Sequence, residues 1–347
     1  MSALTSREDG RDNAATEVLI DALPPIEPGG SVLVIDDRTG TVGRELTGRS
    51  LSVTSWSRLA RGSRAGLAWP EEGAYDAATL RLPRSKEALE LALHAAACRL
   101  RPGAPLWIYG ANDEGIKSAH KRISPLLGPV NVLDARRHCR VIEATRPESA
   151  DGLSTSLEAF KRTLTLTLPD GERDVVSYPG VFAKGRLDPG TAMLLGALPP
   201  LEDGARVLDF ACGAGIIAGF VARKHPEVAL WMTDADAIAL AAAVEHAPTA
   251  TALCGDRWGS IQGSRQFDRI LSNPPIHEGK GRTYDVLNEL ISGAPARLRP
   301  GGQLWLVVQR QIPADKVMEE TFRKVSLAAE NTRFRVWCGQ GRKRQQR

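Results

Sequence analysis

The segment LSNPPIH, residues 271–277, places an asparagine and two prolines directly after an apolar stretch that reads as a β-strand. Proline can neither continue a sheet nor freely begin a helical turn, so Pro274 and Pro275 predict a rigid exit from the strand. Asn273 is then fixed at the strand end, where its side-chain oxygen and the Pro274 carbonyl form a pair of acceptors. Such a pair can hold both hydrogens of a planar exocyclic amine and turn the nitrogen lone pair toward a methyl group. In isolation, the segment is more often a simple loop stop.

Acidic residues are predicted at the ends of three successive strands, Asp209 in VLDFACGAG, Asp234 in VALWMTDAD and Asp256 in ATALCGD. A carboxylate about 20 residues past a glycine loop can accept both hydroxyls of a ribose, and the next acid is suitably placed for an adenine amino group. Asp234 is also a candidate helix N-cap, although Asp236 can take that role instead. Together the three acids predict a positively charged, adenosine-containing ligand, which is S-adenosylmethionine.

The turn between the first of these strands and the following helix is rich in small residues. Gly213 and Gly215 allow positive φ values and a close approach of the backbone to a ligand. The pattern differs from the dinucleotide-binding G-x-G-x-x-G, because Gly219 comes one place late and Asp209 precedes the loop. That acid would repel a pyrophosphate and attract a cation. The turn residues Ala211 and Cys212 are expected to line the same cofactor.

Composition excludes several classes of protein. The chain has 347 residues, a formal net charge of +4 and five scattered cysteines without a C-x-x-C pair. This spacing argues against a disulfide framework or a zinc site and favours a reducing cytoplasm. No apolar run approaches the roughly 20 residues that cross a bilayer, and the polar N-terminus is not a secretory signal. We therefore expect a cytoplasmic protein that uses no metal.

Three pairs of segments recur in the same order in the two halves of the chain: SVLVIDDRTGTVG with RVLDFACGAGIIAG, YDAATLRLP with FDRILSNPP, and RLRPGAPLWIYG with RLRPGGQLWLVV. Short apolar runs alternate with Ala-rich helical segments, which predicts parallel strands joined by helical crossovers. The fold class is therefore α/β, with two tandem Rossmann-like domains that arose by duplication.

The predicted boundaries follow from composition. They are a disordered N-terminus (1–15), a degenerate first domain (16–146), a linker with a β-hairpin (147–185), a catalytic domain (186–338) and a basic C-terminal tail (339–347). The hairpin is predicted because Thr and Leu alternate in TLTLTL and the turn residues Pro169, Asp170 and Gly171 follow. The tail could hold phosphates or simply be solvated.

The segments VLDFACGAGIIA, TDAD and LSNPPIH together resemble the class I S-adenosylmethionine-dependent methyltransferases that modify exocyclic or amide nitrogens. With the duplicated architecture and YPGVFAKGRLDPGTAMLL, the chain looks more narrowly like the RsmC/RlmG-type ribosomal RNA guanine-N2 methyltransferases. The resemblance runs from about residue 15 to TRFRVW. It implies methylation of the N2 amine of a guanine in ribosomal RNA, with the 16S RNA of the small subunit as the expected substrate, free or within a subunit or assembly intermediate. S-adenosylhomocysteine would be the product.

The resemblance also implies roles for single residues. Asp209, Ala211, Cys212, Gly213 and Gly215 would line the methionine side of the cofactor, Asp234 its ribose and Asp256 its adenine. Asn273, Pro274 and Pro275 would orient the guanine amine, with Asn273 beside the cofactor as well. The family usually has an aromatic residue after NPP, where this chain has Ile276, so base packing is either weaker or taken over by His277 or another aromatic residue. His277 as a general base is the less favoured role. Phe182, Lys184 and Arg186 are expected near the substrate, or the two cations are ordinary surface charges.

The first half has lost the residues of this chemistry. Val34 stands in place of the acid, Arg38 in place of the first glycine and Arg81 in place of Asn273, so we expect no cofactor there. The segment GANDEGIKS nearly spells a phosphate loop but carries one extra residue, Ile116, which should disable it. Lys117 and Ser118 are instead candidates for contact with an RNA phosphate or nucleotide, or belong to a solvated helix face.

Alternative functions stay open at this point. They are N-methylation of 23S ribosomal RNA, of a protein glutamine amide or of a small molecule, and a non-catalytic role in RNA binding or assembly. The duplicated domain and basic tail exceed what a metabolite needs. A non-catalytic factor should show decay in both halves, whereas the second half keeps all three acids and the NPP segment.

Overall fold

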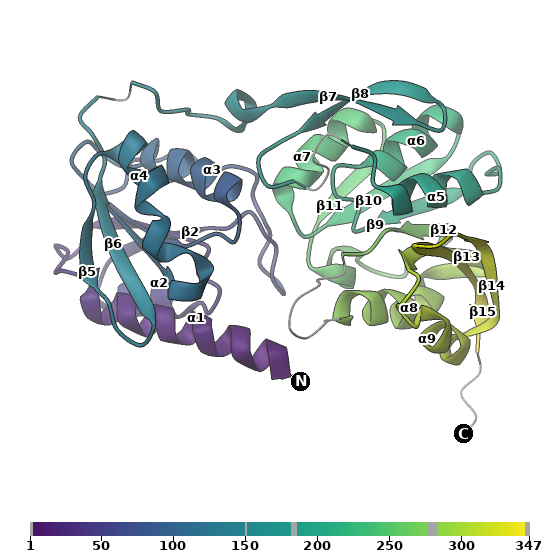
Figure 1. Cartoon of the computed structure of the whole chain (residues 1–347), viewed down its shortest axis with the longest axis horizontal. Helices are drawn as coiled ribbons and strands as arrows, with labels where there is room; N and C mark the ends of the chain where they lie inside the picture. Colours follow the sequence, from purple (N-terminus) through teal and green to yellow (C-terminus); the bar gives the residue numbers. More distant parts are fainter. Residues whose placement is uncertain (1–2, 150, 182–185, 276–283, 344–347) are drawn as a thin grey trace. The chain divides into compact units, whose positions relative to one another are not determined.

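A computed structural model of the chain describes residues 3–149, 151–181, 186–275 and 284–343, with side-chain burial from residue 10 onward. The chain divides into two compact units (Figure 1). The first unit comprises Met1–Arg58 and Leu67–Phe160, and the second comprises Leu59–Gly66 and Lys161–Arg347. Both are α/β, as the alternation of apolar runs and helical segments predicts. Among the described residues no helix is long and apolar enough to span a membrane.

The first unit is built on a six-stranded mixed sheet with the order β2-β1-β3-β4-β6-β5. The neighbouring pairs from β2 to β4 in this order are parallel, whereas β6 is antiparallel to both of its neighbours, β4 and β5. The strands are β1 (Ser31–Ile35), β2 (Ser52–Trp56), β3 (Ala77–Arg81), β4 (Pro105–Ala111), β5 (Asn131–Asp134) and β6 (Cys139–Thr145).

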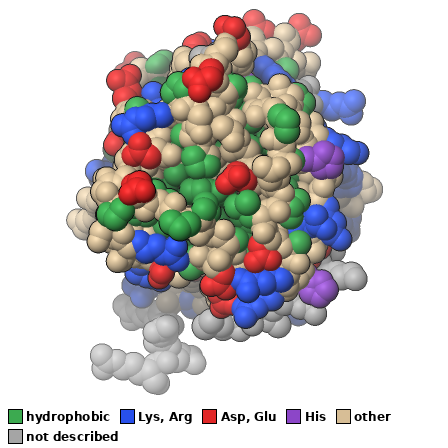
Figure 2. Space-filling model, turned by 90° about the vertical axis from the view of Figure 1, so that its left-hand side faces the viewer, with side chains coloured by type: hydrophobic (Ala, Val, Ile, Leu, Met, Phe, Trp, Pro, Cys, Tyr) green, Lys and Arg blue, Asp and Glu red, His purple; other side chains and the backbone are tan. Residues whose placement is uncertain are grey.

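Helices and short 3-10 turns complete the first unit. They are α1 (Ala3–Ala22), α2 (Thr41–Gly48), α3 (Lys86–Ala97), η1 (Asn112–Glu114), η2 (Ile116–Ser118), α4 (His120–Leu127) and η3 (Leu157–Phe160). Helices α1 and α2 pack on the same core as β1 and β4. Figure 2 draws the left-hand side of the view in Figure 1 and shows hydrophobic side chains near the middle of that face, with charged ones around them.

The expected disorder of residues 1–15 is wrong for residues 3–15, which lie in α1. Apolar residues spaced by three and four along the second half of this helix, such as Ala15, Val18 and Leu19, are buried against the sheet. The first half is polar and contains a glycine, which is why its sequence reads as disordered. Its Arg11 instead pairs with Asp113 and its Asp12 with Arg81, and both partners are distant in the sequence.

The second unit is built on a seven-stranded sheet with the order β11-β10-β9-β12-β13-β15-β14. The neighbouring pairs from β11 to β13 in this order are parallel, whereas β15 is antiparallel to both of its neighbours, β13 and β14. The strands are β9 (Arg206–Phe210), β10 (Ala229–Asp234), β11 (Thr251–Cys254), β12 (Phe267–Ser272), β13 (Leu298–Gln309), β14 (Phe322–Glu330) and β15 (Phe334–Arg342).

Helices cover both faces of this sheet and form two separate cores (Figure 1). One face carries α5 (Pro189–Ala197), α6 (Ile216–Lys224) and α7 (Ala237–His246). The other carries η4 (Arg257–Ser260), α8 (Asp285–Arg297) and α9 (Ala314–Thr321). Because the strands β9 to β12 are parallel, their carboxyl ends meet at one edge of the sheet, which is where Asp209, Asp234 and Asn273 lie.

An antiparallel two-stranded sheet, β7 (Arg162–Leu168) with β8 (Gly171–Ser177), belongs to the second unit and turns at Pro169 and Asp170. Its leucines alternate with exposed threonines, and Leu166 and Leu168 are buried. At the other end of the unit, β15 continues to Arg342, so residues 339–342 are paired strand and not part of a tail. Residues 344–347 of the expected tail lie outside the described residues.

The two sheets begin with the same arrangement of polar groups. In the first unit the Asp76 carboxylate accepts a hydrogen bond from the Ser31 backbone N–H at 2.7 Å and pairs with Arg101. In the second unit Asp268 accepts from the Arg206 N–H at 2.8 Å and pairs with Arg299 at 3.3 Å. Each aspartate thus joins the starts of two central strands to the segment RLRPG.

Candidate functional site

Asp209 is a fully buried carboxylate near the end of β9. Its Oδ2 accepts a hydrogen bond from the Ala218 N–H at 3.0 Å, whereas Oδ1 is buried and has no hydrogen-bond partner among the described residues. Burial raises the pKa of this carboxyl to about 7, and the like charge of Asp234 acts in the same direction. A buried carboxylate oxygen without a donor is suited to a cationic ligand.

Asp234 is the last residue of β10 and organises the loops around it. Its Oδ2 accepts from the Gly213 N–H at 2.8 Å and its Oδ1 from the Asp236 N–H at 2.8 Å. Burial raises the pKa of Asp234. The N-cap of α7 is Asp236, whose Oδ1 accepts from Ile238 at 3.0 Å, so the capping alternative for Asp234 is excluded.

The turn from β9 to α6 uses left-handed backbone at three positions, with φ values of 56° at Ala211, 53° at Gly213 and 74° at Gly215. The two glycines differ in their surroundings. A Cβ on Gly215 would lie 2.6 Å from the Cβ of Ala243, whereas one on Gly213 would meet no described atom within 4 Å. Gly215 is therefore needed for packing, and Gly213 faces open space beside the carboxylates. Burial keeps the pKa of the Cys212 thiol well above its usual range.

Asp256 follows β11 and meets a segment from far upstream. Its Oδ2 accepts a hydrogen bond from the Gly62 N–H at 3.4 Å. The same segment, residues 59–66, bonds to the loop after β10 through Ala60 N–H and the Ala235 carbonyl at 2.7 Å. The second unit therefore contains an arm from the first half of the sequence beside two of the predicted acids, which the sequence reasoning missed.

Asn273 directly follows β12, and its amide is fixed by two acceptors. Nδ2 donates to Asp188 Oδ1 at 2.8 Å and to Thr191 Oγ1 at 2.9 Å. Both amide hydrogens are used, and the described residues contribute no hydrogen bond to Oδ1. The carbonyl oxygen is thus the side of the amide that is left to accept a hydrogen bond from a ligand.

Asp188 and Thr191 were not singled out from the sequence. Asp188 Oδ1 also accepts from the Thr191 N–H at 2.9 Å, so Asp188 is the N-cap of α5 and Pro189 is at the first helical position. The segment LDPGT carries the signal for this cap, because Asp followed by Pro is typical of a helix start. The contact of the cap with Asn273, 85 positions away, has no local signal.

The remaining predicted residues around the NPP segment are only partly described. Ser272 donates its hydroxyl to the Phe210 carbonyl at 2.7 Å, which ties the end of β12 to β9. Pro274 is buried, and Pro275 is exposed. Arg186 is exposed. The other predicted substrate residues lie outside the described residues, namely Phe182, Lys184, Ile276 and His277.

His246, at the end of α7, connects the glycine turn to the hairpin. Its Nε2 accepts a hydrogen bond from the Val176 N–H at 2.7 Å, so its Nδ1 carries the proton and donates to the Ala214 carbonyl at 2.6 Å. Burial lowers the pKa of His246, and the backbone of Ala214 opposes this effect. The neutral imidazole therefore ties the turn between β9 and α6 to β8.

In the first unit, Lys117 and Ser118 are exposed in the 3-10 turn η2 ahead of α4. The Ser118 hydroxyl donates to the Gly115 carbonyl at 3.0 Å. The backbone of Gly115 has φ 97°, which separates η1 from η2. The two side chains are thus presented at the surface of this unit, although α4 itself begins only at His120.

Two family models match the chain. The model described as "Methyltransferase small domain" matches residues 172–338, and the one described as "Methyltransferase small domain N-terminal" matches residues 30–157.

Similar proteins extend over most of the chain. Ribosomal RNA small subunit methyltransferase C of Stutzerimonas stutzeri is 34% identical over 326 residues, covering 89% of this chain and 94% of the relative. Its namesake from Ectopseudomonas mendocina is 36% identical over 285 residues, covering 81% and 84%. Among solved structures, the T. thermophilus 16S rRNA guanine-N2 methyltransferase RsmC, in complex with AdoMet and guanosine, matches with a TM-score of 0.82 at 26% identity. It covers 95% of this chain and 92% of its own.

Proposed function

The chain belongs to the ribosomal RNA small subunit methyltransferase C family, and on this basis we propose that it transfers a methyl group from S-adenosylmethionine to the N2 amine of a guanine in 16S ribosomal RNA. Its α/β fold is that of the class I methyltransferases. The similar structure contains AdoMet and guanosine, the two ligands that this reaction requires. A ribosomal substrate places the protein in the cytoplasm, with free RNA, a small subunit or an assembly intermediate as its partner.

The observation that carries the proposal is the fixed amide of Asn273. With both of its hydrogens donated to Asp188 and Thr191, Oδ1 is available as an acceptor for one hydrogen of the guanine N2 amine. The Pro274 carbonyl is the proposed acceptor for the other. The amine is a weak nucleophile because its lone pair is delocalised into the ring. Two fixed acceptors orient it and stabilise the positive charge that develops on nitrogen.

S-adenosylmethionine fits the carboxyl edge of the second sheet on two observations, the buried Oδ1 of Asp209 without a donor and the open space at Gly213. When bound, the cofactor supplies a methyl group activated by a sulfonium. Asp209, with the turn residues Ala211, Cys212, Gly213 and Gly215, would hold its methionine part. Asp234 would accept from the ribose and Asp256 from the adenine, and the arm 59–66 would lie against the adenosine end.

Substrate contacts are proposed for residues beyond this edge. Pro275 would help Asn273 and Pro274 to orient the guanine amine. Ile276 stands where the family usually has an aromatic ring, so base packing would be either weaker or taken over by His277 or another aromatic residue. Phe182, Lys184 and Arg186 would lie near the RNA. A guanine must leave its stack to reach Asn273, so an unpaired or weakly paired guanine is the expected target.

The first unit, within residues 16–146, is proposed to recognise RNA without binding a cofactor, and Lys117 and Ser118 would contact a phosphate. We infer that it is a duplicate of the catalytic unit. The matching arrangements around Asp76 and Asp268 support this origin, because the same bonds recur at the same sequence positions of the repeat. The hairpin within 147–185 would then be an insertion between the two copies.

Nucleoside mapping of ribosomal RNA from a strain lacking this protein tests the function. We expect a single missing N2-methylguanosine in the 16S RNA, restored by the wild-type gene and not by Asn273→Ala. An unchanged guanosine profile with a methyl group missing elsewhere would refute the substrate. Calorimetry with S-adenosylhomocysteine checks the cofactor separately, since the wild type should bind it and Asp234→Ala should not.

A further inference from the structure

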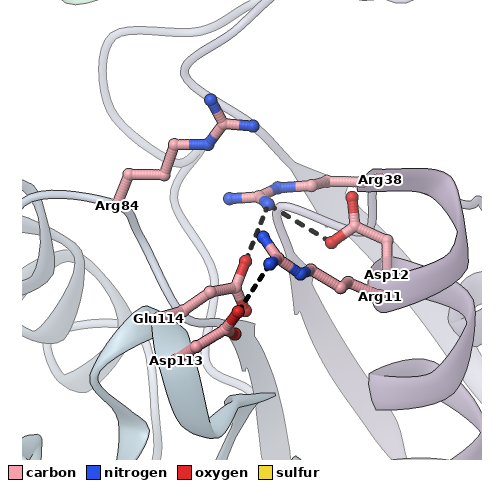
Figure 3. Close-up of a pocket in the computed structure, with 6 residues that line it drawn as sticks. All are labelled: Arg11, Asp12, Arg38, Arg84, Asp113 and Glu114. Carbon is pink, nitrogen blue, oxygen red and sulfur yellow. Dashed lines mark hydrogen bonds and ion pairs between the residues drawn. The ribbon is translucent and has the colours of Figure 1, made fainter. Parts of the chain in front are cut away.

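The first unit contains a cavity of about 320 Å³ at the carboxyl ends of β1, β3 and β4 (Figure 3). This edge corresponds to the cofactor edge of the second unit. Charged side chains from α1, from the loops after β1 and β3, and from η1 line the cavity: Arg11, Asp12, Arg38, Arg84, Asp113 and Glu114. The chemistry of the cavity is therefore that of ion pairing, not of apolar packing.

A buried guanidinium occupies the floor. Arg81, at the sequence position that corresponds to Asn273, is 1% exposed. Its Nη2 lies 2.7 Å from a carboxylate oxygen of Asp12 and 2.7 Å from one of Glu114. Burial disfavours the charged guanidinium, but the two carboxylates more than offset this, so the pKa of Arg81 is raised. Asp12 and Glu114 are thus largely engaged inward.

Arginines form the open part of the cavity. Arg38 is largely buried, with Nη1 3.2 Å from Asp12 and Nη2 3.4 Å from the Leu82 carbonyl. Arg11 pairs with Asp113 at 2.5 Å, and both are about half exposed. Figure 3 shows Arg84 entering from the opposite side, with its guanidinium directed toward the same space as those of Arg38 and Arg11. Like charges that converge in this way favour an anion between them.

The arginines of the cluster suit one particular anion. Arg11, Arg38 and Arg84 line the cavity together with three carboxylates, and the buried Arg81 pairs with two of these acids. A phosphodiester of RNA carries one negative charge, and its oxygens match the fork of a guanidinium. We propose that this cavity binds a phosphate group of the RNA backbone and so holds the substrate while the second unit methylates it. The RNA source of the phosphate rests on the proposed function.

Two other predicted RNA contacts, Lys117 and Ser118, follow shortly after the cavity residues Asp113 and Glu114 in the sequence. Lys117 is exposed and follows Glu114 by three residues, with the exposed Ser118 beside it. A backbone that enters the cavity would therefore find further donors close by in η2. Within the loop sequence, the acids Asp113 and Glu114 are paired with Arg11 and Arg81, which limits their repulsion of a phosphate.

Arg84→Gln is the variant that tests the site, because Arg84 is exposed and the buried cluster of Arg81 stays intact. Arg101→Gln is the matched control, because Arg101 is an exposed arginine of the same unit. It pairs with Asp76, which lies just before the start of β3, whereas Arg84 lies beyond the end of that strand. Binding of a fluorescein-labelled single-stranded oligoribonucleotide to the full chain is measured by anisotropy, without cofactor, over a series of salt concentrations. Titration with inorganic phosphate forms the second arm.

We expect Arg84→Gln to weaken RNA binding and to lower the slope of log K against log salt by about 0.7, the value for one phosphate of a single strand. Arg101→Gln should match the wild type. Equal affinity and slope for Arg84→Gln and wild type would overturn the proposal. A third outcome is that the wild type binds inorganic phosphate but no RNA, and that Arg84→Gln loses the phosphate binding. This result would support an anion site. That outcome would overturn RNA as the ligand of this cavity, whereas the proposed methylation is tested separately by the nucleoside mapping described above.

Discussion

The Asp188 carboxylate accepts a hydrogen bond from Nδ2 of Asn273 at 2.8 Å while it caps helix α5. One oxygen, Oδ1, serves both purposes, since it also accepts from the Thr191 N–H. The start of α5 therefore determines which way the amide of Asn273 faces. A substitution of Asp188 should therefore alter methyl transfer by changing the orientation of the Asn273 amide.

Replacing Asp188 with alanine should lower kcat about 100-fold, because the amide of Asn273 loses one of its two acceptors and its orientation. The free energy of unfolding should fall by about 1 kcal/mol through loss of the cap. Asp188→Asn keeps an oxygen acceptor and should restore most of both. Ser85→Ala, which removes the cap of α3, should cost a similar stability without the loss of turnover. Equal kcat in Asp188→Ala and wild type would show that Asn273 is oriented by other contacts.

Asn273→Ala should retain affinity for S-adenosylhomocysteine in calorimetry and lose methyl transfer by at least about 100-fold. The cofactor contacts proposed for the three acids remain in this variant, whereas the acceptor for the amine is gone. Methyl transfer is followed with a labelled methyl group on the cofactor. A variant that still turns over would mean that a different group positions the nucleophile.

Cofactor affinity should rise with pH up to about 7. Asp209 has a pKa raised to about 7 in the free protein by burial, and the proposed cationic ligand favours its ionised form. Below pH 7 binding must release a proton, so affinity should fall by up to tenfold per pH unit. The free energy of unfolding of the protein without cofactor should instead fall as the pH rises from about 4 to about 7, because the folded chain keeps the Asp209 proton over this range and the unfolded chain does not. Calorimetry between pH 5.5 and 7.5 checks this, and a wild-type profile no steeper than that of Asp209→Asn would contradict it.

The two glycines of the turn should respond differently to alanine. Gly213→Ala meets no described atom within 4 Å and should cost only about 1 kcal/mol of left-handed strain, yet its methyl group would enter the space assigned to the cofactor and abolish binding. Gly215→Ala places a methyl 2.6 Å from the Cβ of Ala243 and should cost about 3 kcal/mol. Thermal unfolding and calorimetry on both variants separate the effects. Full cofactor affinity in Gly213→Ala would place the ligand elsewhere.

Acid should destabilise the second unit through His246. Its pKa is lowered in the folded chain, so its contribution to stability is present above its usual value of about 6.5 and is lost as the pH falls through the folded value. Protonation would add a hydrogen to Nε2, which accepts from Val176. His246→Leu should unfold more readily and with less dependence on pH between 5 and 7. His138→Gln, at an exposed position of the first unit, should retain the dependence of the wild type.

The elements that were predictable from the sequence depend on local patterns. The alternation of apolar runs and helices is typical of parallel α/β sheets, and Pro274 and Pro275 mark the end of β12 because proline cannot extend a sheet. The missed features depend on contacts between distant residues. Asp188 meets Asn273 across 85 positions, and the arm 59–66 reaches Asp256 across 194. Helix α1 was missed because its first half is stabilised by ion pairs that no local pattern reveals.

The paired anchors at Asp76 and Asp268 lie where the strands begin, far from the ends that carry Asp209 and Asn273. The residues that join the strands and the residues assigned to ligands therefore lie at opposite edges of each sheet. On the proposed duplication, the strand ends of the first unit could acquire arginines such as Arg38 and Arg81 without loss of the contacts that join the strand starts. The first unit could then bind a different ligand while the second unit kept the residues of the reaction.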